Sequence, residues 1–222
     1  MMKLTILGYY GAYPHDGVGT SAYLLEKDGF ALALDFGSGA FLALEKHVPF
    51  GQVDAVLLSH FHHDHTADVG VLQYARQLNG FEDLLPIYGH SALGSLLVDG
   101  VGEEHLYADG ETFEIGPFKI KAFRGLHPVE CYGFVIDDEV VFSNDTGYFD
   151  GLAAHFEGAK LGVFDSYNAN PKAHLMVSEI IEIAEKAGVE KVLLTHLPQA
   201  GLGSVELPAN FVLASDVEVI EC

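Results

Sequence analysis

Three histidines and an aspartate stand close together in the order His60, His62, Asp64 and His65. In an extended chain, residues two apart project to the same side, so His60 and His62 should converge on one point. Asp64 and His65 follow where the chain turns towards a predicted helix, and they can reach a second point nearby. Imidazole and carboxylate ligands without a thiolate suit zinc, and also manganese or iron, in a site open to water. The stretch therefore predicts a catalytic rather than a structural metal site.

This metal stretch is predicted to lie between a strand and a helix. Residues 55–58 form a short apolar run typical of a buried strand, so the histidines follow at its end, in a loop. Residues 67–78 are predicted to form an amphipathic helix. Its apolar side chains at helical spacing, which we expect to face the core, are Val71, Tyr74, Ala75 and Leu78.

Further polar residues stand at or just past the ends of other predicted strands. They are Asp35, His127, Asp145 and His196, at strands predicted over 30–35, 118–123, 139–143 and 191–195. A carboxylate such as Asp35 can orient a histidine ligand without binding the metal itself, or it can simply be a turn residue. The remaining predicted elements are strands over 3–8, 21–26, 112–115, 131–136 and 160–164 and a helix over 176–187 that ends at Gly188.

Two segments are harder to interpret. Residues 79–109 are predicted to hold only a short strand over 86–88 and a helix over 92–98. The loop over 8–20 is Gly-rich, aromatic and longer than a hairpin needs. It is either a rim that contacts substrate through its tyrosines or backbone N–H groups, or a surface loop. Its aromatic side chains could also mediate a homodimer.

The composition predicts one soluble α/β domain over residues 1–222, because 49% of the residues are hydrophobic. The net charge of −21, from 32 acidic and 11 basic residues, would repel a nucleic-acid backbone. We therefore expect a small-molecule substrate and no extended nucleic acid as partner. Cys131 and Cys222 indicate no disulfide framework, and no segment is typical of a signal peptide or a membrane span. A cytoplasmic protein without a membrane partner is predicted.

The order of these residues resembles the metallo-β-lactamase superfamily. The resemblance runs through Asp35, His60-x-His62-x-Asp64-His65, His127, Asp145 and His196, over nearly the whole chain. It implies an α/β (α+β) fold, the four-layer αβ/βα sandwich with two mixed β-sheets. It also implies two divalent metal ions, with zinc expected and manganese or iron as alternatives. One ion would be held by His60, His62 and His127 and the other by Asp64, His65 and His196, with Asp145 bridging both.

Further details are similar to the ribonuclease Z group of phosphodiesterases within that superfamily. They are residues 143–146, residues 132–134 after His127, and the Leu-Leu-Thr run before His196. The resemblance implies that His174 protonates the leaving oxygen, whereas a surface histidine is the alternative reading. Asp165-Ser166 stands where a glutamate is often found, which predicts a weaker orienting partner for His174.

The resemblance implies hydrolysis of a small phosphodiester such as a cyclic nucleotide. A hydroxide held between the two ions and oriented by Asp64 would attack phosphorus, and His174 would be the general acid. A transfer-RNA 3′-processing endonuclease is disfavoured, because the chain between His127 and Asp145 is too short for a basic arm. A lactonase or thioesterase of the same fold is the main alternative. An oxidoreductase of this fold would need a carboxylate in place of a histidine ligand, and a binding module would lack ligands.

Overall fold

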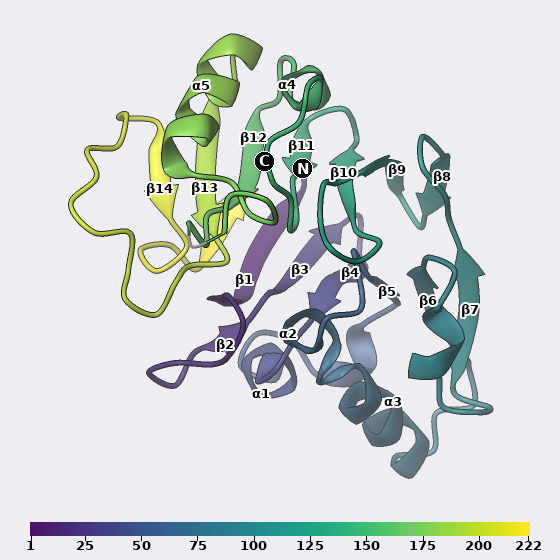
Figure 1. The fold of residues 1–222 in the computed structure, drawn as a ribbon. Helices are drawn as coiled ribbons and strands as arrows, with labels where there is room; N and C mark the ends of the chain where they lie inside the picture. The colour runs from purple at the N-terminus through teal and green to yellow at the C-terminus, as the bar shows by residue number, and fades with distance from the viewer. Residues whose placement is uncertain (169) are drawn as a thin grey trace. The chain divides into compact units, whose positions relative to one another are not determined.

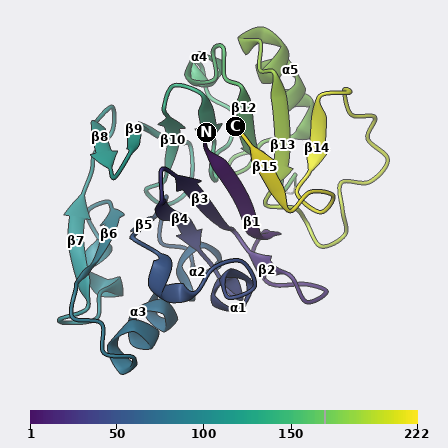
Figure 2. The ribbon, with the colours of Figure 1, turned by 180° about the vertical axis from the view of Figure 1, so that it is seen from behind.

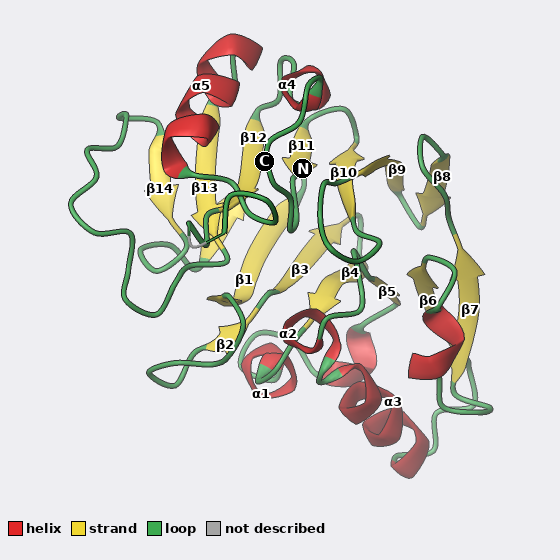
Figure 3. Cartoon of the chain, viewed as in Figure 1, coloured by secondary structure: helices red, strands yellow, loops and turns green. Residues whose placement is uncertain are grey.

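The computed structural model describes residues 1–168 and 170–222. The chain forms two compact units. Unit 1 comprises residues 1–108, 115–117 and 219–221, and unit 2 comprises residues 109–114, 118–218 and 222. Each unit is built on one mixed β-sheet with its own helices beside it, as Figures 1 and 3 show. The two mixed sheets agree with the predicted fold class, whereas the prediction of a single domain over 1–222 stays a prediction.

The sheet of unit 1 has the strand order β15-β1-β3-β4-β5-β6-β7. The first strands form an antiparallel meander, and β4 to β7 then run parallel. Figure 2 shows β15, from the end of the chain, beside β1. Because β4 and β5 are parallel, the residues that follow them emerge at the same sheet edge. The strands are β1 Lys3–Tyr10, β3 Ala22–Lys27, β4 Phe30–Phe36, β5 Ala55–Leu57, β6 Leu85–Gly89, β7 Gly102–Leu106 and β15 Val219–Glu221, with β2 Gly19–Thr20 paired to β1.

The sheet of unit 2 has the order β14-β13-β12-β11-β10-β9-β8. Here too an antiparallel part, β9 to β11, is followed by parallel strands, β11 to β14. Asp137, Asp138 and Glu139 connect β10 to β11, and the φ values of 54° and 59° at the two aspartates are the left-handed conformation of a tight hairpin turn. The strands are β8 Thr112–Ile115, β9 Phe118–Arg124, β10 Tyr132–Ile136, β11 Val140–Phe142, β12 Leu161–Asp165, β13 Lys191–Thr195 and β14 Phe211–Leu213.

Helix α5, Val177–Ala187, confirms its prediction. Its buried face consists of Val177, Ile180, Ile183, Ala184 and Ala187. Glu179 closes the first turn by accepting a hydrogen bond from the Met176 N–H at 2.8 Å. Gly188 ends the helix with a φ of 69°, which glycine adopts without strain.

The other helices are short, apart from α3. They are α1 Ala40–Leu44, α2 His63–Thr66, α3 Val69–Leu78 and α4 Leu152–His155. The helix predicted over 92–98 is only a 3-10 turn, Leu93–Leu96. A second 3-10 turn covers Phe50–Gln52. Among the described helices, none combines the length and the apolar character that crossing a membrane requires.

The predicted inner face of α3 is wrong. Val71, Tyr74 and Leu78 are 45%, 55% and 83% exposed, whereas the buried residues are Val69, Leu72, Gln73 and Arg76. Two polar side chains can face inwards because their polar ends find partners. The Gln73 amide donates to the Leu96 carbonyl at 2.8 Å and accepts from the Val98 N–H at 2.7 Å. The Arg76 guanidinium contacts Asp83 at 2.6 Å and the Val53 carbonyl at 3.5 Å, so these partners offset much of the cost of burying the two polar side chains.

This orientation of α3 gives a stability prediction. Leu72→Ala should lower the free energy of unfolding by about 2–5 kcal/mol, because it removes a fully buried side chain and leaves a cavity. Leu78→Ala, on the exposed face, should change it by less than about 0.5 kcal/mol. Urea denaturation of the two variants measures both values. Equal losses would contradict the observed face.

Candidate metal centre

His60 and His62 lie in the segment between β5 and α2, and their side chains converge. The Nε2 atom of His60 is 3.1 Å from the Nδ1 atom of His62. Two imidazole nitrogens bound to one tetrahedral zinc at about 2.0–2.1 Å would be about 3.3 Å apart. The spacing therefore fits two ligands of a single ion. The Ser59 hydroxyl lies 3.0 Å from the other nitrogen of His60 and steadies the ring.

Asp35 lies at the end of β4 and holds the neighbouring ligand segment in place. Its carboxylate accepts hydrogen bonds from the Ser59 N–H at 2.8 Å and the Ser59 hydroxyl at 2.7 Å. It is also 2.7 Å from Nδ1 of His65, and both side chains are buried. A carboxylate only accepts, so Nδ1 of His65 carries the proton and Nε2 is left as the ligand atom. The structure thus places Asp35 behind a histidine, as the first of the two sequence interpretations expects.

The backbone of Asp35 is strained, with a φ of 51°. Asn144, two residues after β11, and His196, directly after β13, have φ values of 47° and 51°. Residues other than glycine adopt this conformation at a cost and tend to do so where function requires it. Three chain turns of the same strained type therefore deliver polar residues at strand ends.

Asp35→Asn should weaken metal binding by about 10- to 100-fold, because the amide is neutral and can no longer enforce the His65 tautomer. Competition with a coloured zinc chelator measures the affinity. Asp54→Asn is a matched control, because Asp54 also accepts a backbone hydrogen bond after a turn, from Ala31 at 2.8 Å, without contacting a histidine. Unchanged zinc affinity in Asp35→Asn would remove the residue from the site.

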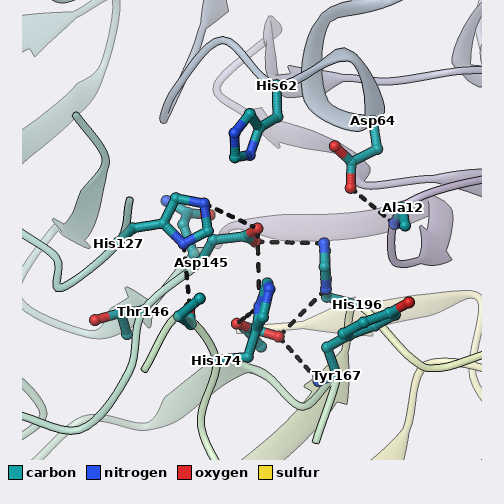
Figure 4. A network of polar contacts seen from close by, with 12 residues as sticks. Ala12, His62, Asp64, His127, Asp145, Thr146, Tyr167, His174 and His196 are labelled. Carbon is teal, nitrogen blue, oxygen red and sulfur yellow. Dashed lines mark hydrogen bonds and ion pairs between the residues drawn. The ribbon is translucent and has the colours of Figure 1, made fainter. Parts of the chain in front are cut away.

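The Asp64 side chain is oriented by a hydrogen bond from the loop over 8–20. Its Oδ2 atom accepts a hydrogen bond from the Ala12 N–H at 2.8 Å, as Figure 4 shows. The same oxygen lies 3.9 Å from Nε2 of His65. Ala12 has a φ of 60°, so the loop is bent to present this N–H. Only the unusual length of the loop could have indicated this contact in the sequence.

In unit 2, His127 follows β9 and Asp145 follows β11. Nδ1 of His127 lies 3.1 Å from the Ala173 carbonyl, which requires a proton on this nitrogen and leaves Nε2 as the ligand atom. Nε2 is 4.0 Å from Oδ2 of Asp145. The Thr146 hydroxyl accepts from the Leu126 N–H at 2.9 Å and joins the two ligand segments.

Asp165, at the end of β12, contacts two histidines, His174 and His196. Its Oδ2 is 2.7 Å from Nδ1 of His174, and its Oδ1 is 3.3 Å from Nδ1 of His196. The Tyr167 N–H donates to the same Oδ1 at 3.0 Å. Asp165 was expected to be a weaker partner for His174. This expectation is wrong, because the shorter aspartate still reaches the ring directly from its strand end.

His196 and His174 both lie close to Asp145. Nε2 of His196 is 3.4 Å from Oδ1 of Asp145, and Nδ1 of His174 is 3.9 Å from its Oδ2. Burial opposes the charged form of His174, but the hydrogen bond and charge of Asp165 and the charge of Asp145 outweigh it. The pKa of His174 is therefore raised above its ordinary 6.5.

Each unit thus brings its own set of predicted residues together. Unit 1 gathers His60, His62, Asp64, His65 and Asp35, and unit 2 gathers His127, Asp145, His174 and His196. Asp165 and Ser59 are the residues that sequence analysis undervalued. The donor set of imidazoles and carboxylates, with tautomers held by backing acceptors, fits zinc and similar divalent ions. The assignment of ligands to two separate ions combines both units and stays a prediction.

Comparison with known proteins gives a consistent result. Residues 36–197 match the family model described as the beta-lactamase superfamily domain. The chain is 36% identical over 217 residues to the probable metallo-hydrolase YhfI of Bacillus subtilis, covering 90% of this chain and 89% of YhfI. The crystal structure of YhfI matches with a TM-score of 0.84 over 89% of this chain and 86% of that one.

Two more distant crystal structures share the fold. A diphosphatase from the PhnP family is 20% identical, with a TM-score of 0.82 over 100% of this chain and 98% of that one. The short form of human tRNase Z is 21% identical, with a TM-score of 0.81 over 99% of this chain and 98% of that one. These matches confirm the predicted fold class.

Proposed function

Because the chain belongs to the beta-lactamase superfamily and is a metallo-hydrolase of that fold, we propose that it is a dinuclear phosphodiesterase. Its proposed substrate is a small phosphodiester such as a cyclic nucleotide. The observation that carries the proposal is the pair of Asp165 and His174 at 2.7 Å, close to Asp145. The pair provides a positioned proton donor for a leaving oxygen.

The proposed ligands follow the family pattern. His60, His62 and His127 would hold one ion, and Asp64, His65 and His196 the other, with Asp145 shared between them. Zinc is the proposed metal, with manganese or iron as alternatives, because the donors are imidazoles and carboxylates only. When bound, two such ions supply an activated water and offset the charge that builds up on the phosphoryl oxygens.

Two side chains of this protein would guide the reaction. Asp64, whose carboxylate is oriented by the Ala12 N–H, would also accept a hydrogen bond from the attacking water. His174 would donate the proton that the departing alkoxide needs. Since Asp165 takes the hydrogen bond from Nδ1, Nε2 is the nitrogen of His174 that can give up its proton.

The charge of the chain supports a small substrate. With a net charge of −21 and 11 basic residues, the protein has few cations to neutralise a long phosphate backbone. The segment between His127 and Asp145 is occupied by β10, β11 and the short turn 137–139 rather than by a basic arm. The match to human tRNase Z therefore supports phosphodiester chemistry more than it supports transfer RNA as substrate.

The test is a hydrolysis panel with protein of known metal content. An activated phosphodiester, a lactone and a thioester are compared at equal enzyme concentration, and chelator-treated protein is the control. The proposal expects the highest kcat/KM for the diester. A preference for the lactone or the thioester would overturn the phosphodiesterase assignment in favour of an acyl hydrolase of the same fold.

A further inference from the structure

The end of β1 and the loop that follows it contain an aromatic segment that the proposed chemistry does not use. We propose that this segment, residues 9–15, is a subsite that stacks on a planar group of the substrate, such as a nucleobase. We call it the aromatic loop. The inference rests on the proposed function and names the part of the substrate that is recognised beside the phosphodiester.

The aromatic loop is tied to a proposed metal ligand. The Ala12 N–H donates to Oδ2 of Asp64 at 2.8 Å, and Tyr13 is the next residue along the chain. Consecutive Cα atoms are about 3.8 Å apart, so the backbone of Tyr13 lies within a few ångströms of this contact. A ligand whose reacting group is bound beside Asp64 would therefore have this loop within reach of its other substituents.

The far arm of the loop is packed against the same region. A Cβ atom on Gly37 would lie 2.0 Å from the Asp64 carbonyl oxygen and 2.3 Å from the Thr20 hydroxyl. A Cβ atom on Gly19 would lie 2.5 Å from the Ser38 carbonyl oxygen. Glycine at both positions allows the arm to pack closely beside Asp64. The loop is thereby held at its middle and at its end, which favours a preformed surface.

The side chains of the aromatic loop form a group of rings. The rings of Tyr9 and Tyr10 are 4.9 Å apart, and His15 meets Tyr10 edge-on at 5.4 Å. Tyr13 is 56% exposed. Tyr9, Tyr10 and His15 are partly buried, so Tyr13 presents the most accessible ring of the segment. An accessible aromatic ring can stack on a single nucleobase, and such stacking tolerates any base because each has a π-face.

Charge favours stacking over ionic recognition at this place. Residues 8–20 contain no lysine or arginine, and their one carboxylate, Asp16, lies 3.4 Å from His15. In a chain with a net charge of −21, this stretch carries a single carboxylate, so it should repel an anionic nucleotide only weakly. An uncharged aromatic surface can bind the base while the phosphodiester is held elsewhere.

The experiment compares thymidine 5′-(p-nitrophenyl) phosphate with methyl p-nitrophenyl phosphate, which has the same leaving group but no base. Tyr13→Ala should lower kcat/KM for the thymidine ester by about tenfold and leave the methyl ester within about twofold. Tyr13→Phe keeps the ring and should retain the preference. Tyr74→Ala is the matched control, because Tyr74 on α3 is equally accessible, at 55% exposed.

Calorimetry of thymidine 5′-monophosphate binding is a second readout that needs no turnover. Its Kd should rise about tenfold in Tyr13→Ala and stay unchanged in Tyr74→Ala. Unchanged Kd and unchanged ester preference in Tyr13→Ala would overturn the subsite while the phosphodiesterase assignment stands. If neither ester is hydrolysed, the proposed function fails, and the calorimetric comparison still decides whether Tyr13 binds the base.

Discussion

Asp145→Ala is expected to lose at least one of the two proposed metal ions and to lower kcat/KM for a phosphodiester by about 10³-fold. Asp145 is buried, and its two oxygens lie near Nε2 of both His196 and His127, at 3.4 Å and 4.0 Å. Two divalent ions close together repel each other unless an anionic ligand is shared between them. Loss of one ion should remove several kcal/mol of transition-state stabilisation. This loss of free energy corresponds to the expected fall of about 10³-fold in kcat/KM.

Elemental analysis and steady-state kinetics on the same preparation measure this result. Asp150→Ala is a suitable control, because Asp150 is an exposed carboxylate in the same loop after β11. If Asp145→Ala retained two ions per chain, Asp145 could not be the shared ligand. The ligand assignment would then have to be rebuilt around the remaining carboxylates.

His174→Ala is expected to keep both ions and to lose about 10²-fold or more in kcat, the usual contribution of a general acid. The alanine removes the proposed proton donor but no proposed ligand, so the protein should retain its metal while kcat falls. With p-nitrophenyl esters the loss should shrink strongly, because p-nitrophenolate departs without needing a proton. Full activity on an alkyl diester, or loss of metal, would refute the role of His174.

Asp165→Asn tests the pair of Asp165 and His174 by changing the carboxylate instead of the histidine. Because Asp165 contacts both His174 and His196, this variant should lower kcat and also weaken one metal site. His63→Ala is the control, since it removes an exposed imidazole from the metal stretch itself. If Asp165→Asn lowered only the free energy of unfolding and left kcat unchanged, the role of Asp165 would be structural and not catalytic.

The positions of the site residues could be predicted largely from the pattern of strands. Apolar runs with a histidine or aspartate at their end or within three residues after it mark β4, β5, β11 and β13. Within each sheet, parallel strands bring such ends to the same edge. The partnership of Asp165 and His196 could not be predicted in this way. It depends on the register in which Asp165 pairs with Thr195, across strands far apart in the sequence.

The error on α3 has a different physical cause. Its apolar residues show helical spacing on one face, but the side that is buried carries the polar residues Gln73 and Arg76. Their partners, such as Val98 and Asp83, lie outside the helix and are not apparent from its periodicity. Likewise, β7 has the polar sequence Gly-Glu-Glu-His-Leu, and it forms a strand because β6 offers it a free edge.

Titration of metal-free protein with zinc, while bound zinc and phosphodiester hydrolysis are followed together, tests the central claim most directly. The account predicts that two ions bind per chain and that hydrolysis rises until the second is bound. Full activity with one ion and no binding of a second would contradict the dinuclear site. Two bound ions without phosphodiester hydrolysis would contradict the proposed reaction.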